Sequence, residues 1–326
     1  MTSFASDLAE YKRICNEVDP ACDQIYVDRQ RVNYLRLFEA FPVPRPAEVE
    51  TAVHALELPG RTLHLHVHRR RDAVAAEEPC LLYAHGGGFI AGGLEASESI
   101  AMDLAAALRI TVVNFSYRLA PEHPFPAALE DCHAILCEVA AHPARYGARA
   151  DRLLFGGESC GGNFAAALPL YARDRGGPRL FAQVPINPVF DVHRWAYREV
   201  TDCDPAFCDE MVNYTGKYLH AGDGGLAPYA SPLRAGDLSG LGPFFIWAAE
   251  IDPLAKESEA FAARLDAAGV ACHLHIERGV VHGSLRARAR YEFAAAGFRR
   301  LCGGIRALLD GEIRLNAPGP RLEAGV

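Results

Sequence analysis

Short apolar runs that alternate with stretches of helical character are the feature that most restricts the fold of this chain. The apolar runs span residues 80–85, 110–116, 152–156, 180–187, 243–249 and 271–277. The helical stretches between most of them span residues 99–108, 127–142, 163–173 and 255–268. Strands that are apolar throughout and alternate with helices are typical of a mostly parallel sheet covered on both faces. The sequence therefore predicts an α/β fold.

The beginning of the chain is predicted to be separate from this alternation. Leu35 and Phe38 can share one apolar stripe of a helix. The proline-rich run at residues 41–46 ends any such helix, because proline lacks a backbone N–H donor and restricts the residue before it. We therefore expect residues 1–46 to form a helical piece and residues 47–326 to form the main domain.

Two further segments interrupt the alternating pattern. Residues 51–58 and 62–68 flank Pro59-Gly60 and predict a β-hairpin, which adds antiparallel strands at one edge of the sheet. Residues 191–226 are polar, aromatic and glycine-rich, and we interpret them as an insertion. The insertion follows the carboxyl end of a strand, where open α/β sheets place their ligand sites.

Composition excludes several classes of protein. The chain has 326 residues, of which 50% are hydrophobic and 23% charged, as in ordinary globular proteins. Its net charge of −8 argues against a nucleic-acid partner, which needs a clustered positive surface. Apolar stretches such as residues 244–249 are too short to cross a bilayer, and residues 1–20 lack the basic start and apolar run of a secretory signal. We expect a cytoplasmic protein without a membrane span.

The ten cysteines do not predict a metal site. They contain no C-x-x-C pair, and a structural zinc site usually needs two such pairs. A disulfide framework is typical of short secreted chains, which this chain does not resemble. We interpret most of the thiols as small buried hydrophobic groups in a reducing compartment.

Three histidines share one face of the predicted strand at residues 62–68, because side chains alternate along a strand. They are His64, His66 and His68. Such a row could ligate a metal ion. The sequence instead favours an exposed polar face opposite a buried apolar one, because no carboxylate lies nearby in the sequence. We expect no metal site.

A candidate nucleophile lies in the segment Gly157-Glu158-Ser159-Cys160-Gly161, which fits the pattern G-x-S-x-G. The segment follows the apolar run at residues 153–155 and precedes the helical stretch at residues 164–168. A strand, a sharp turn and then a helix are the context that a nucleophile elbow requires. The pattern predicts that Ser159 is exposed at the end of its strand.

A second glycine-rich segment, His85-Gly86-Gly87-Gly88, follows the apolar run at residues 81–83. Three consecutive glycines allow backbone N–H groups to point toward a negative charge that develops on oxygen. A phosphate-binding loop is the alternative, but neither of the usual phosphate-loop patterns fits this segment.

A serine nucleophile needs a histidine base, and the base needs a carboxylate that orients it. The histidines downstream of Ser159 are His193, His220, His273, His275 and His282. We favour His282, because it lies in a loop after the last predicted strand. The acid is expected after the strand at residues 244–249, where Glu250 and Asp252 are both available. We favour Asp252, which precedes a proline.

Taken in order, these motifs resemble the hormone-sensitive-lipase branch of the α/β-hydrolase esterases. The similarity extends over roughly residues 81–282 and includes four more segments. These are Tyr117–Ala127, Tyr229–Leu233, Asp252-Pro253-Leu254 and His282-Gly283. The resemblance implies the α/β-hydrolase fold: a mostly parallel sheet of about eight strands, helices on both faces, and a helical cap built from residues 1–46 and 191–226.

The resemblance also implies a mechanism and a substrate class. Ser159 would be the nucleophile, His282 the base and Asp252 its orienting acid, and the N–H groups of Gly87, Gly88 and Cys160 would form an oxyanion hole. The expected substrates are small carboxylic esters with short to medium acyl chains. No cofactor is expected, and a homodimer is compatible with the resemblance.

Three positions depart from the family pattern. Glu158 and Cys160 stand where the family usually has Asp and Ala, and Ser284 stands where an aromatic residue often follows His-Gly. None of these changes removes a catalytic atom, but they alter the expected shape of the pocket. An amidase or carbamate hydrolase with the same triad is the main alternative function. A non-catalytic receptor for a small ligand is a further one.

Overall fold

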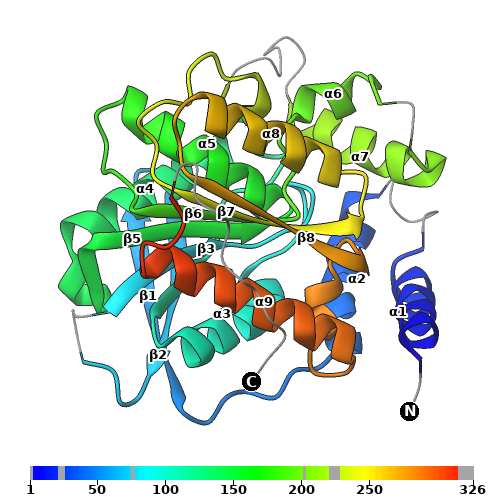
Figure 1. Cartoon of the computed structure of the whole chain (residues 1–326), viewed down its shortest axis with the longest axis horizontal. Coiled ribbons are helices and arrows are strands. Elements are labelled where there is room, and N and C mark those ends of the chain that lie inside the picture. The colour runs from blue at the N-terminus through cyan, green and yellow to red at the C-terminus, as the bar shows by residue number, and fades with distance from the viewer. Residues whose placement is uncertain (1–2, 21–25, 75–77, 201–202, 220–227, 315–326) are drawn as a thin grey trace.

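A twisted sheet of eight strands forms the centre of the computed structural model (Figure 1). The model describes residues 3–20, 26–74, 78–200, 203–219 and 228–314. The strands are β1 Val49–Leu58, β2 Arg61–Arg70, β3 Glu78–Ala84, β4 Thr111–Phe115, β5 Ala148–Glu158, β6 Ala182–Ile186, β7 Phe244–Ile251 and β8 Cys272–Val281.

The strand order is β1-β2-β4-β3-β5-β6-β7-β8. All neighbouring pairs from β4 to β8 are parallel, whereas β1 pairs with β2, and β2 with β4, in antiparallel fashion. The prediction of a mostly parallel sheet with an antiparallel hairpin at one edge is therefore confirmed.

The main helices cover both faces of this sheet. They are α3 Leu94–Leu108, α4 Ala127–Ala141, α5 Cys160–Asp174, α8 Ala255–Ala267 and α9 Glu292–Leu309. Leu81 packs in a core with α3 and α9, while its neighbour Leu82 packs in a core with α4 and α5. Because successive strand residues point to opposite faces, the continuous apolar runs supply both cores at once. Figure 1 shows α3 and α9 on one side of the sheet and α5 and α8 on the other.

Four more helices gather on one side of the molecule, at the right in Figure 1. They are α1 Phe4–Val18, α2 Val27–Ala40, α6 Val192–Ala196 and α7 Pro205–Tyr218. The described elements also include three short 3-10 helices, η2 Pro143–Tyr146, η3 Pro232–Arg234 and η4 Ser284–Ala287. Helices α6 and α7 belong to the predicted insertion. Its glycines at 222, 224 and 225 lie outside the described residues.

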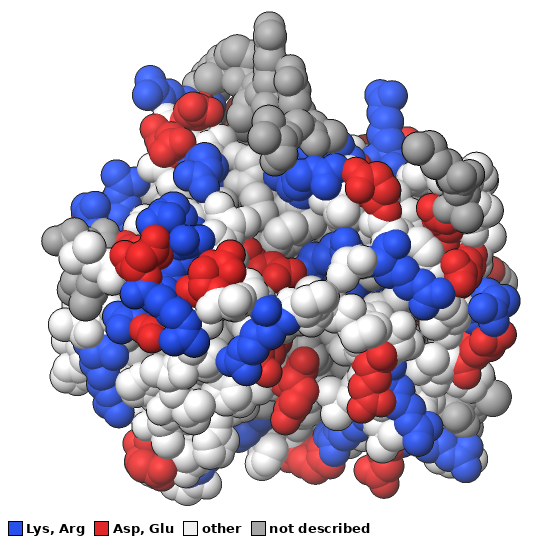
Figure 2. Space-filling view, turned by 90° about the horizontal axis from the view of Figure 1, so that it is seen from below, with Lys and Arg blue, Asp and Glu red and all other residues white. Residues whose placement is uncertain are grey.

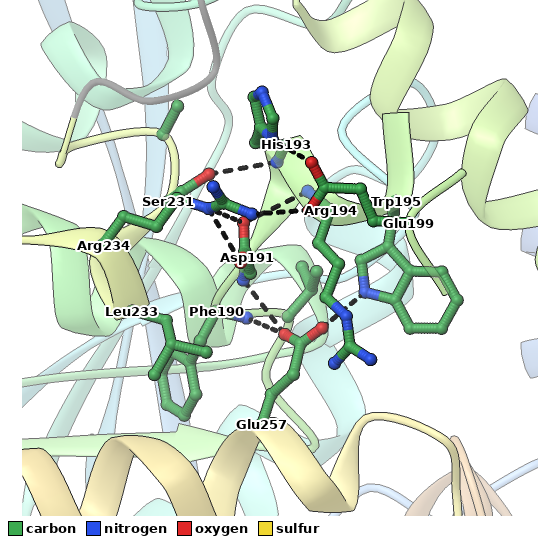
Figure 3. Close-up of polar contacts among 12 residues, drawn as sticks. Phe190, Asp191, His193, Arg194, Trp195, Glu199, Ser231, Leu233, Arg234 and Glu257 are labelled. Atoms are coloured by element: carbon green, nitrogen blue, oxygen red, sulfur yellow. Dashed lines mark hydrogen bonds and ion pairs between the residues drawn. The ribbon is translucent and has the colours of Figure 1, made fainter. Parts of the chain in front are cut away.

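A buried carboxylate of α8 binds the start of the insertion through three hydrogen bonds (Figure 3). Glu257 of α8 accepts hydrogen bonds from the backbone N–H groups of Phe190 and Asp191, at 2.7 and 3.0 Å, and from the indole N–H of Trp195 at 2.6 Å. Burial raises the pKa of Glu257 to about 7, although these donors oppose the rise. Asp191 also accepts a 2.8 Å hydrogen bond from Arg234. These hydrogen bonds hold the first residues of the insertion in place against α8.

The cysteines differ from the expectation. Cys203 and Cys208 form a disulfide, because the turn that enters α7 brings their Cα atoms to 6.4 Å. Of the other described cysteines, only Cys80, Cys132 and Cys160 are fully buried, and the remaining four are half-buried. The interpretation of most thiols as buried hydrophobic groups was therefore wrong. Cys22 lies outside the described residues.

Two surface properties bear on partners. On the face shown in Figure 2, acidic and basic side chains are interspersed rather than gathered into one basic patch. Among the helices that the structure describes, none is long and apolar enough to cross a membrane.

Asp131 of α4 is the buried carboxylate on which we base a stability prediction. Its side chain is 0% exposed and accepts hydrogen bonds from Arg61 at 2.7 Å and from Arg118 at 2.9 to 3.0 Å. Asp131→Asn should lower the free energy of unfolding by about 3 kcal/mol, because it removes the buried anion that two part-buried guanidinium groups share. Urea denaturation measures the change. The adjacent Glu130→Gln, at an exposed ion pair of Arg118, is the control and should cost about 1 kcal/mol or less. Equal losses in the two variants would contradict the prediction.

Candidate active site

Ser159 lies in a sharp turn between β5 and α5. Its backbone has φ 57° and ψ −115°, a conformation that is costly for any residue except glycine. A Cβ atom on Gly157 or on Gly161 would collide with the carbonyl oxygen of Ala84 at the end of β3. The two glycines of the G-x-S-x-G pattern are thus required by close backbone packing. The turn places Ser159 beyond the carboxyl end of β5.

The glycine-rich loop leaves β3 beside this turn. Gly87 and Gly88 have φ of 121° and 60°, values that side chains rarely permit. A Cβ atom on Gly88 would also overlap the ring of Tyr214 on α7. The loop is therefore confined between the Ser159 turn and α7.

His85, the first residue of this loop, stabilises it through contacts with Tyr117. Its ring stacks on Tyr117 with 4.1 Å between centroids, and the Tyr117 hydroxyl donates a 2.8 Å hydrogen bond to the carbonyl of His85. Burial lowers the pKa of His85 to about 4, so the imidazole is neutral near pH 7. Its Nδ1 lies 2.8 Å from the carbonyl oxygen of Gly86. The side chain of His85 is engaged within the loop.

Cys160 is the first residue of α5, and the first N–H groups of a helix have no partner within it. Its backbone N–H is thus suited to an anionic ligand. The thiol is fully buried, 3.6 Å from the hydroxyl of Tyr117 and 3.8 Å from the carbonyl of His85. Burial raises the pKa of this thiol, which makes it a poor nucleophile.

Asp252 and His282 follow the adjacent strands β7 and β8 and form a close pair. Oδ2 of Asp252 lies 2.6 Å from Nδ1 of His282, and Oδ1 accepts a 3.0 Å hydrogen bond from the N–H of Leu254. The Asp252 side chain is 1% exposed and the His282 side chain 28%. Burial lowers the pKa of His282, but the charge of Asp252 and its hydrogen bond outweigh burial. The pKa of His282 therefore lies above its usual value of 6.5.

The pairing of β7 with β8 explains why Asp252, rather than Glu250, meets the histidine. The register pairs Ala249 with Glu277, and after an irregularity it pairs Ile251 with Val281. This bulge brings the residue after Ile251 level with His282. The carboxylate of Glu250 instead accepts a 2.7 Å hydrogen bond from the N–H of Gly279.

Ser159 and His282 line one small cavity of about 40 Å³ beneath α7. The other residues that line it are Gly88, Phe89, Cys160, Val189, Phe207, Glu210, Met211, Tyr214 and Thr215. Its volume fits little more than one water molecule, so α7 closes the site in this conformation. A larger cavity of about 460 Å³ lies between α2 and α3 and contains none of the predicted site residues.

A family model described as the α/β-hydrolase fold matches residues 81–286. The chain belongs to the α/β-hydrolase family. The predicted fold and the predicted kinship with carboxylesterases of this family are confirmed.

Two relatives and two solved structures illustrate the kinship. The α/β-hydrolase is 37% identical to carboxylesterase NlhH of Mycobacterium tuberculosis over 63% of this chain, and the match spans only 66% of that relative. It is 33% identical to carboxylic ester hydrolase LipN of the same organism, over 86% of this chain and 76% of LipN. A hyperthermophilic esterase from Pyrobaculum calidifontis superposes with TM-score 0.77 at 27% identity, covering 96% of this chain and 100% of that one. Ester-hydrolase EH1AB1 from the Lake Arreo metagenome superposes with TM-score 0.81 at 29% identity, covering 94% of this chain and 99% of that one.

Two of the departures from the family pattern differ in how the structure accommodates them. Ser284 is buried and folds back on the turn that carries His282, where its hydroxyl donates a 2.5 Å hydrogen bond to the carbonyl of Val281. Glu158 is buried behind the elbow, and within the described part of the chain its Oε1 has no hydrogen-bond partner.

Sequence reasoning missed the residues of α7 that line the cavity. Asp204-Pro205 carried a usable signal, because Asp is a favoured N-cap and Pro a favoured first helical residue. The Asp204 carboxylate does accept hydrogen bonds from the N–H groups of Ala206 and Phe207, at 3.0 and 3.2 Å.

The histidine row on β2 is less exposed than expected. His64 is exposed, but His66 is half-buried and His68 is fully buried. Ligand atoms of His66, His68 and Glu98 of α3 lie within 4.8 Å of one another. Both ring nitrogens of His68 already make contacts, at 2.9 Å to Thr51 and 2.8 Å to Asn114, which explains its burial without an ion.

The choice between the two acids of the α/β-hydrolase is testable. Asp252→Asn should lower kcat for p-nitrophenyl acetate by about 10⁴-fold, because an amide neither fixes the same tautomer nor stabilises the imidazolium. Glu250→Gln is the matched control and should change kcat less than about tenfold, since its carboxylate is engaged by Gly279. Circular dichroism verifies folding. A larger loss in the Glu250 variant would reverse the assignment.

Proposed function

We propose that this α/β-hydrolase is a carboxylesterase that cleaves small esters through an acyl-enzyme on Ser159. The observation that carries the proposal is the 2.6 Å contact of Asp252 with His282, in a site where His282 and Ser159 line one cavity. The cavity brings the proposed nucleophile and base within reach of one substrate, and Asp252 orients the base from outside the cavity. Relatives named as carboxylesterases support the same conclusion.

The mechanism follows from the roles of these groups. Ser159 attacks the ester carbonyl while His282 takes the hydroxyl proton, and the carbonyl oxygen becomes an oxyanion. The N–H groups of Gly87, Gly88 and Cys160 donate hydrogen bonds to that oxyanion. His282 then protonates the departing alcohol. Water then attacks the acyl-enzyme while His282 takes its proton. As the bond between the acyl carbon and the Ser159 oxygen breaks, His282 returns the proton to that oxygen and the acid leaves.

Residues 1–46 and 191–226 act as a cap in this proposal. Helix α7 covers Ser159, and the hydroxyl of Tyr11 on α1 donates a 2.9 Å hydrogen bond to the carbonyl of Gly283, next to His282. The proposed substrates have short to medium acyl chains, and the cavity of about 40 Å³ has to enlarge to admit any of them. The reaction needs no cofactor. A cytoplasmic location and a homodimer remain predictions.

Labelling with an organophosphate tests the proposal directly. The reagent should inactivate the enzyme with one adduct on the peptide that contains Ser159, located by mass spectrometry. Matched p-nitrophenyl esters and anilides then separate an esterase from an amidase, and hydrolysis of the esters should be faster. Adducts on another residue would overturn the nucleophile, and preferred cleavage of anilides would favour the amidase alternative.

The proposal also fixes the pH dependence of turnover. Only neutral imidazole accepts the Ser159 proton, and the pKa of His282 is raised above 6.5. The rate constant kcat/KM should therefore be full above that raised pKa and fall about tenfold per pH unit below it. In Asp252→Asn the apparent pKa should be lower, because burial then lowers the pKa of His282 unopposed by the carboxylate. A rate that rises as the pH falls would contradict this mechanism.

A further inference from the structure

The cavity at Ser159 contains a feature that ester hydrolysis itself does not require. Among the described residues that line it, Glu210 is the one carboxylate. Phe207, Glu210, Met211 and Tyr214 recur at the spacing of one helix face, so α7 presents them together toward the site. Phe207, Met211 and Tyr214 are apolar or aromatic, and the hydroxyl of Thr215 on the same face donates a hydrogen bond to the carbonyl of Met211.

Tyr214 fixes the place of the carboxylate. Burial is the largest cause that raises the pKa of the Tyr214 phenol, and the charge of Glu210 and a hydrogen bond to it add to the rise. The phenol therefore stays protonated, and the ring of Tyr214 rests against Gly88 of the glycine loop. Glu210 is half-buried and lines the same small cavity as Ser159.

A carboxylate beside aromatic rings is a recognition site for organic cations. Ammonium groups are attracted to the faces of Phe and Tyr rings, and the attraction grows when water is excluded. Phe207 and Tyr214 supply such rings on either side of Glu210 along α7. The overall charge of −8 acts in the same direction, since it attracts cationic substrates and repels anionic ones.

We propose that Glu210 makes the site select esters that carry a positive charge a few bonds from the ester group, such as quaternary or tertiary ammonium esters. The inference rests on the proposed esterase function and names its substrate class. Glu210 is a specificity residue in this proposal and takes no part in proton transfer.

A pair of isosteric esters tests the proposal. Acetylcholine and 3,3-dimethylbutyl acetate have nearly the same shape and differ by one positive charge. The wild type should hydrolyse acetylcholine with a kcat/KM at least tenfold higher, measured by acid release at constant pH. Glu210→Gln should lower the ratio of the two kcat/KM values by at least tenfold. Because the readout is a ratio, any effect of the variant on both esters cancels.

Two controls sharpen the test. Glu259→Gln removes an exposed carboxylate of α8 and should leave the ratio within about twofold of wild type. Tetramethylammonium should compete with p-nitrophenyl acetate in the wild type, with an inhibition constant at least tenfold weaker in Glu210→Gln. The competition reports binding without relying on turnover of a charged ester.

The outcomes separate the two proposals. A wild-type ratio near one, or an unchanged ratio in Glu210→Gln, overturns cation selection while ester hydrolysis stands. Hydrolysis of p-nitrophenyl acetate without hydrolysis of acetylcholine also overturns it. If no ester is cleaved and Ser159 takes no organophosphate, the esterase function fails and cation selection fails with it.

Discussion

Close packing of backbone against backbone at the end of β3 is the constraint on which the site depends. The carbonyl oxygen of Ala84 lies so near the Ser159 turn that a side chain on Gly157 or Gly161 would collide with it. This contact places the glycine loop, which continues from β3, directly beside Ser159. A parallel sheet makes the contact possible, because β3 and β5 are neighbours that end at the same edge. The strained backbone of Ser159 persists because the buried strands β3 and β6, which flank β5, hold the turn in place.

The second constraint is electrostatic. In the proposed mechanism His282 is neutral when it accepts a proton and charged afterwards, so its surroundings have to tolerate both states. The buried Asp252 carboxylate stabilises the charged state, and burial disfavours it. Glu158, which replaces the usual Asp, adds a weaker attraction for the charged state, whereas Arg286 opposes it. The pKa of His282 is thus set by burial, by the close anion Asp252 and by more distant charged groups.

The sequence predicted what depends on local pattern and failed where long-range contacts decide. All eight strands were predicted, because apolar strand runs and turn residues are visible locally. The sequence favoured Asp252 over Glu250 from the proline that follows it. The contact of Asp252 with His282 depends on something the sequence does not display, the irregular register of β7 with β8. The inward face of α7 was missed, because the helix is held by contacts with the rest of the chain rather than by its own periodicity. The disulfide of Cys203 with Cys208 is local, and it was missed because the cysteines were interpreted as thiols in a reducing compartment.

Helix α7 links these constraints to substrate entry. Its C-terminal end is fixed: Tyr218 stacks on Phe89 with 3.8 Å between ring centroids, and its carbonyl accepts a 2.8 Å hydrogen bond from the N–H of Phe125. Phe89 follows the glycine loop directly, so movement at this end would disturb Gly87 and Gly88. The cavity must nevertheless enlarge to admit an ester. If α7 moves to admit an ester, we expect the movement to be larger in its N-terminal half, away from the contacts of Tyr218. Glu210 lies in that half, so the proposed selection of the substrate and its entry would depend on the same part of α7.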